Sequence, residues 1–120
     1  MKMRLRSYGD EGNLSEERIG FQVLRDCNLK FFVVYHTNIT DGGFYNRPSD
    51  VFWFYPKDVK AGDEVVLYTK EGTDSSEKKA DGHTIHFFYW GLNSPIIVKG
   101  DCIVLSEVED WSVTRFNKLK

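Results

Sequence analysis

The chain has 120 residues, 41% of them hydrophobic and 15% aromatic, which is enough apolar material for one domain with its own core. Its 16 basic and 18 acidic residues give a net charge of −2, which argues against nucleic acid and against an anionic membrane surface as partners. No apolar run reaches the ~18 residues that span a bilayer, and no apolar signal segment opens the chain. We therefore expect a single cytoplasmic domain over residues 1–120.

The first half of the chain predicts short strands. Residues 3–8, MRLRSY, alternate apolar and basic side chains. Ile19, Phe21 and Val23 fall on one face of the next predicted strand, because side chains alternate across a strand. A helix over SEERIGFQVL is the less favoured alternative, since strand formers and a glycine oppose it. FFVVYHT predicts a further strand, followed by a long loop over NITDGGFYNRPSD.

The second half continues the same rhythm of strands and turns. The predicted strands are VFWFY, EVVLYTK, TIHFFYW, SPIIVKGD, CIVLSEV and WSVTRF. The polar stretch KEGTDSSEKKADG is interpreted as a solvated connection between two of them. Seven to nine short strands separated by turn residues predict an all-β protein, an immunoglobulin-like antiparallel β-sandwich.

Two of these strands, VFWFY and TIHFFYW, carry apolar side chains on both faces. Either both faces are covered by other elements, which we favour, or the outer aromatic row is a binding surface. In TIHFFYW we expect Ile85, Phe87 and Tyr89 to face the core. The candidate binding surface consists of Trp53, Tyr55, Phe88 and Trp90.

The following strand has a clearer pattern. Ile103 and Leu105 are expected on one face and Cys102 and Val104 on the other, with Asp101 in the preceding turn.

No catalytic, cofactor-binding or metal-binding residue is predicted. His83 and His86 form H-x-x-H, but residues three apart on a strand point to opposite faces and cannot share a metal. Cys102 follows Asp101, whose negative charge disfavours a reactive thiolate. We expect Cys27 and Cys102 to be free thiols.

Three stretches of the second half resemble the lamin-tail domain family: DVKAGDEVVLYTKEG, FFYWG and GDCIVLSEVEDW. The resemblance rests on a turn at Gly62, on Trp90, and on Gly100-Asp101 before an apolar strand, and it covers residues 51–113. Ala61 departs from the family's usual proline. The resemblance implies an immunoglobulin-like β-sandwich that acts as an interaction module without an active site. No coiled-coil heptads precede it, as in a stand-alone version of the prokaryotic type.

The function that follows is a non-catalytic β-sandwich module that binds a protein partner. The alternative is a carbohydrate- or ligand-binding module that uses the aromatic surface, which would require at least two exposed and coplanar rings. An enzyme that pairs His83 or His86 with an acidic neighbour is a third and weaker hypothesis. The sequence predicts no oligomeric state.

Overall fold

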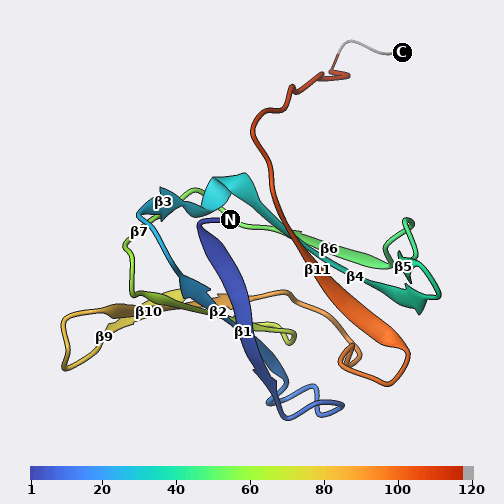
Figure 1. Cartoon of the computed structure of the whole chain (residues 1–120), viewed down its shortest axis with the longest axis horizontal. Helices are drawn as coiled ribbons and strands as arrows, with labels where there is room; N and C mark the ends of the chain where they lie inside the picture. Colours follow the sequence, from blue (N-terminus) through green and yellow to red (C-terminus); the bar gives the residue numbers. More distant parts are fainter. Residues whose placement is uncertain (118–120) are drawn as a thin grey trace.

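The computed structural model describes residues 1–117 and consists largely of β-strands (Figure 1). The strands are β1 (Met3–Gly9), β2 (Arg18–Val23), β3 (Cys27–Asn28), β4 (Phe32–Thr40), β5 (Gly43–Phe44), β6 (Asp50–Trp53), β7 (Asp58–Val59), β8 (Glu64–Tyr68), β9 (Ser75–Lys78), β10 (Thr84–Tyr89) and β11 (Asp101–Glu107). The 3-10 turn η1 (Leu29–Phe31) precedes β4. Within the described residues there is no α-helix, and hence none that could cross a membrane.

The all-β prediction is confirmed, but the number of strands differs from the seven to nine expected. Eleven strands are present in residues 1–117, and three of them, β3, β5 and β7, are only two residues long. Such short pairings leave no periodic pattern in a sequence. A fourth strand, β9, lies inside the polar stretch that was predicted to be only a connection.

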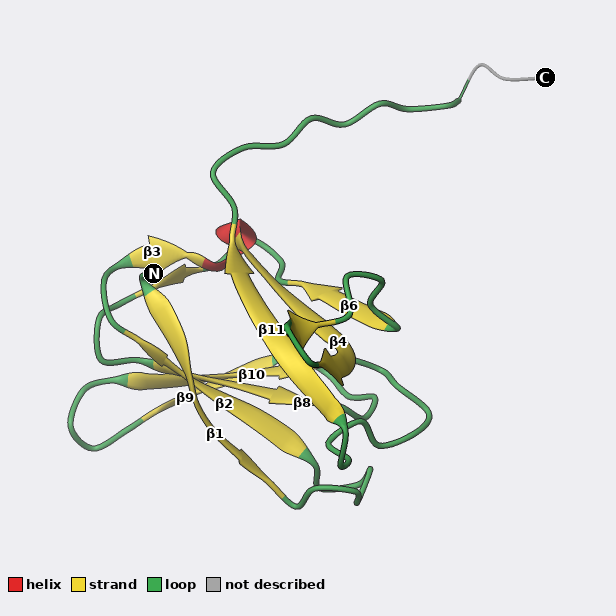
Figure 2. Ribbon diagram, turned by 45° about the vertical axis from the view of Figure 1, so that its right-hand side comes forward, coloured by secondary structure: helices red, strands yellow, loops and turns green. Residues whose placement is uncertain are grey.

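The strands form two larger sheets and a small ribbon (Figure 2). One sheet has the order β1-β2-β8-β10-β9. In the other, β4 pairs with β11 along one side and with β6 and β5 along the opposite side. The ribbon pairs β3 with β7.

The prediction that all strands pair antiparallel is wrong at one place, where β10 runs parallel to β8. After β8 the chain skips one strand position to form β9, and β10 then turns back into the gap. Because β10 is antiparallel to β9, it takes the same direction as β8.

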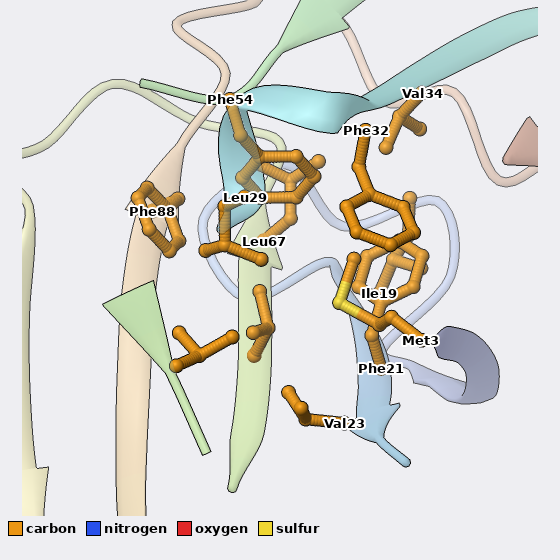
Figure 3. Packing of buried hydrophobic residues seen from close by; sticks show 12 residues of the cluster. Met3, Ile19, Phe21, Val23, Leu29, Phe32, Val34, Phe54, Leu67 and Phe88 are labelled. Carbon is orange, nitrogen blue, oxygen red and sulfur yellow. The ribbon is translucent and has the colours of Figure 1, made fainter. Parts of the chain in front are cut away.

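The core fills the space between the two larger sheets (Figure 3). Ile19, Phe21 and Val23 of β2 are all buried, as their alternation predicted. Phe54, which directly follows β6 of the second sheet, lies edge-on to Phe88 with ring centroids 5.1 Å apart. Edge-to-face contacts of this kind add to the burial of apolar area in holding the sheets together.

The inner face of β10 is the opposite of the one predicted. His86 and Phe88 face the core, whereas Phe87 and Tyr89 lie on the outer face beside Tyr68 of β8. Both faces of this strand are apolar, so alternation alone could not distinguish them.

The expectation that both faces of VFWFY are covered is also wrong. Phe52 and Phe54 pack inward, but Val51 and Trp53, together with Tyr55 just beyond β6, are exposed. In β11, by contrast, Ile103 and Leu105 pack against the core as predicted.

Candidate functional site

A cleft opens along one side of the molecule, between the end strands of the two large sheets. At one end of this side the backbone N–H of Lys2 donates to the Glu107 carboxylate at 3.0 Å, which ties the start of β1 to the end of β11. From there the two strands diverge, as Figure 1 shows. Their divergence leaves a cleft of about 430 Å³. Clefts of this size are within the range that ligand-binding sites use.

The lining of the cleft is mainly apolar. Ile19 and Ile96 are buried and form its floor. The exposed or half-buried apolar side chains around the floor are Leu5, Tyr8, Ile39, Ile97, Val98 and Ile103. Among residues 1–117, the charged residues that line the cleft are Glu11, Lys99 and Asp101. Exposed apolar side chains gathered in a hollow with a charged rim are typical of a surface that a partner covers.

Leu5 illustrates why this surface is exposed. It follows Met3 in the alternation of β1, and Met3 is fully buried, so the pattern alone would place Leu5 in the core. The pairing of β1 with β2 shifts register between Leu5 and Ser7. Leu5 lines the cleft and is 40% exposed.

Both strands beside the cleft are free along one edge. Among the strands of residues 1–117, β1 pairs only with β2, and β11 pairs only with β4. A free strand edge presents unpaired backbone N–H and C=O groups that can hydrogen-bond to another strand. The opposite end strand, β9, consists of polar and charged residues and is fully exposed, whereas β11 is predominantly apolar.

A buried carboxylate fixes the floor of the cleft. Glu17 is fully buried and accepts four hydrogen bonds, from the backbone N–H groups of Gly12, Ile96 and Ile97 and from the Thr69 hydroxyl, at 2.8–3.0 Å. Burial alone would raise the pKa of Glu17, but these hydrogen bonds outweigh it and lower the pKa. The ionised carboxylate thus holds the segment that connects β10 to β11 against the rest of the core.

A histidine between two carboxylates adjoins the cleft through Asp101, which lines it. His36 of β4 lies with Nδ1 2.8 Å from Asp50 of β6 and with Nε2 2.7 Å from Asp101 of β11. Asn38 donates to the other oxygen of Asp101 at 2.8 Å. Burial alone would lower the pKa of His36, but the two carboxylates raise it. His36 of β4 thus links β6 and β11 through its two carboxylate partners, and Asp101 begins β11 rather than lying in the turn predicted for it.

A second line of polar side chains lies near the other end of the sheet that contains β1, at strands β10 and β9. Lys57 Nζ donates to Ser76 Oγ at 2.7 Å, Ser76 Oγ lies 3.2 Å from His86 Nδ1, and His86 Nε2 lies 3.0 Å from Asp63. Serine, histidine and aspartate in this order also occur in acyl-transfer enzymes. Here Ser76 and His86 form a cross-strand pair, and neither lines the cleft. Their hydrogen bonds attach the polar strand β9 to β10.

The four residues of the predicted aromatic surface do not form one surface. Trp53 is 47% and Tyr55 76% exposed on the outside of the second sheet. Phe88 is only 3% exposed, and Trp90 packs against the core beside Phe52.

The aromatic ring that packs against Trp53 is Trp111, which was not part of the predicted surface. The two indoles are 5.1 Å apart with their planes at 78°. A flat sugar-binding platform needs coplanar rings, so this geometry weakens the carbohydrate alternative.

The two histidines of H-x-x-H have separate partners. His83 lies 3.4 Å from Asp81 on the surface, whereas His86 is buried against Asp63. The two side chains are thus separated, but His83 lies in the turn before β10 and not on the opposite face of the strand as predicted. Cys27 and Cys102 are both unpaired, on β3 and β11.

Comparison of the chain with protein families, with curated proteins and with solved structures finds no match in any of the three. The class of protein is therefore described by its fold and its cleft alone: it is an all-β, sandwich-like protein with an apolar cleft between β1 and β11. The cleft residues could not be recognised in the sequence, since most apolar residues there fall in predicted strands and resemble core residues, and Ile39 falls in the predicted loop over residues 38–50. The one signal was the unusual number of apolar and aromatic side chains.

Proposed function

We propose that the protein is a non-catalytic interaction module that binds an extended segment of a protein partner in the cleft between β1 and β11. The observation that supports this most directly is the combination of an apolar hollow with two free strand edges. An apolar hollow without free backbone groups would suit a compact apolar ligand. An extended polypeptide can use both features at once.

Strand addition accounts for the polar and the apolar parts of the site together. A segment that pairs with the free edge of β11 gains backbone hydrogen bonds, which are independent of sequence. Alternate side chains of that segment point to one face and enter the hollow over Ile19 and Ile96. Specificity then resides in these alternate positions, and apolar side chains are favoured there.

The immunoglobulin-like topology, the kinship with lamin-tail domains and the cytoplasmic location belong to the same proposal. The presence of two facing sheets supports the immunoglobulin-like topology. The kinship is supported by strands β8 and β11, which coincide with the apolar strands of the sequence resemblance. Lamin-tail-like domains are interaction modules, so kinship and binding role are compatible.

A peptide-display selection against the immobilised full chain tests the proposed function. We expect peptides with apolar residues at alternate positions, whose binding is lost in Ile39→Arg. Ile39 lines the cleft and is 58% exposed, so the substitution fills the site without burying a charge. Val51→Arg is the matched control, because Val51 is 51% exposed but lies on the outside of β6. Peptides that bind both variants equally, or no enrichment at all, would refute the proposal.

A further inference from the structure

We infer that the cleft recognises this chain itself: it takes the segment of residues 112–116 from a second copy, so that the protein self-associates by strand exchange. The inference rests on the proposed function and names the partner. It is supported by the segment's sequence, by its position in the structure, and by its charge.

The segment has the composition of a strand but no strand partner. WSVTRF, residues 111–116, alternates apolar with polar side chains at its start and was predicted to be a strand. In the structure residues 108–117 pair with no strand and lead away from the body of the molecule (Figures 1 and 2). Val113 is 74% and Phe116 71% exposed. Large apolar side chains this exposed are stabilised when a partner covers them.

The segment is directed away from the cleft of its own copy. The Val108 backbone N–H donates to the Phe31 carbonyl at 2.8 Å, and Trp111 packs on the rings of Phe31 and Trp53. These contacts fix the base of the segment at the Glu107 end of β11, whereas the cleft lies at its Asp101 end. Residues beyond Trp111 can therefore reach the cleft of a second copy while Trp111 keeps its contacts.

The faces of the segment determine which side chain enters. Residues three apart on a strand point to opposite faces, so Val113 and Phe116 cannot both enter. Phe116 has the larger apolar side chain and shares its face with Thr114, whereas Val113 shares its face with Arg115. We therefore assign Phe116 to the hollow over Ile19 and Ile96.

Charge favours the same pairing. The last ten residues contain Arg115, Lys118 and Lys120 and no acidic residue. The rim of the cleft carries the carboxylates of Glu11 and Asp101 and one opposing charge, Lys99. Because Asp101 is already engaged by His36 and Asn38, Glu11 is the rim carboxylate that attracts the basic segment, and salt should weaken the association.

Sedimentation velocity of the full chain, from micromolar to submillimolar concentration, tests the inference. We expect a dimer, or a ladder of larger species if the exchange does not close. Phe116→Asp and Ile39→Arg should each give monomers, with Val113→Asp weaker in effect than Phe116→Asp. Tyr55→Asp is the matched control for a charge at an exposed aromatic, since Tyr55 is 76% exposed and remote from the cleft.

An equimolar mixture of Phe116→Asp and Ile39→Arg provides a positive test. One variant keeps an intact cleft and the other an intact segment, so the mixture should form a heterodimer with one interface. At concentrations low enough for the wild type to be monomeric, melting curves of all variants should match the wild type, because the substituted side chains are exposed.

Alkylation of the two thiols locates the interface. Cys102 lines the cleft, whereas Cys27 lies on β3 and serves as the internal control. Self-association that fills the cleft should slow alkylation of Cys102 about tenfold when nine-tenths of the clefts are occupied, with Cys27 unchanged.

Two negative outcomes have different meanings. A wild-type chain that stays monomeric, and whose synthetic segment 108–120 does not bind, overturns the self-recognition. If selected peptides still bind the cleft of that monomer in an Ile39-dependent way, the proposed function stands without it. If no peptide binds either, both are refuted.

Discussion

Replacing Glu17 by alanine should destabilise the fold and loosen the floor of the cleft. The Glu17 carboxylate satisfies four donors, and two of them, the Thr69 hydroxyl and the Ile96 N–H, are in buried hydrogen bonds. Without the carboxylate these two donors remain in the interior with no acceptor, whereas Gly12 and Ile97 are partly accessible to water.

The magnitude follows from those two donors. Each buried donor left without a partner costs about 1–3 kcal/mol, or about 2–6 kcal/mol for both. Relief of the carboxylate's own desolvation offsets part of this, so we expect a loss of about 3 kcal/mol. For a domain of this size that loss lowers the melting temperature by about 10 °C. Glu17→Gln should fall between alanine and wild type, because it keeps one oxygen and the volume.

Urea unfolding followed by tryptophan fluorescence measures the effect, with Glu16→Ala as the control. Glu16 is the exposed neighbour, and its truncation should cost less than about 0.5 kcal/mol. The pKa of Glu17 is lowered from its ordinary 4.5, so its contribution is present above that pH and is lost as the pH falls through the lowered value. The wild type and Glu17→Gln should therefore converge in acid. A loss below about 1 kcal/mol for Glu17→Ala would refute the role of the carboxylate.

Three further outcomes are expected. The raised pKa of His36 means that its contribution to stability is complete below about pH 6.5 and declines as the pH rises through the folded-state value, so urea midpoints should fall on going to pH 8, but not in His36→Asn. Phe88→Ala should cost about 3–5 kcal/mol, and clearly more than Phe87→Ala, because only Phe88 is buried; equal melting temperatures would contradict the observed face of β10. Thiol titration after unfolding without reductant should count both Cys27 and Cys102; a count of zero would mean that they are bridged in solution.

The strands that the sequence located correctly are those with one apolar face. In β2, Ile19, Phe21 and Val23 alternate with polar residues or glycine, so there was only one way to bury them. In β10 both faces carry large apolar side chains. Which face points into the core is decided by pairing with β8, a distant segment whose Val65 and Leu67 already face inward. No local pattern contains that information.

The sequence did not predict the polar strand β9 or the cleft, for two different reasons. Residues of β9 need only backbone pairing with β10 on one side and solvent on the other, so their sequence is that of a loop. The cleft exists because β1 and β11 diverge, which depends on how two twisted sheets meet rather than on any residue within them. Leu5 is therefore indistinguishable in sequence from a core residue, and Ile39 from a residue of the loop predicted over 38–50.

The parallel pairing of β10 with β8 has a consequence for how the chain folds. The hairpin β9–β10 joins neighbouring residues through a short turn, and hairpins of this kind form in about 1–10 μs. The pairing of β10 with β8 cannot grow outward from a turn, because a long excursion through β9 separates the two strands, and closing it carries an entropic cost before any contact compensates. We therefore expect the hairpin to dock on β8 as a preformed unit. The rate of refolding should then depend on the integrity of an exposed polar strand that contributes no side chain to the hydrophobic core.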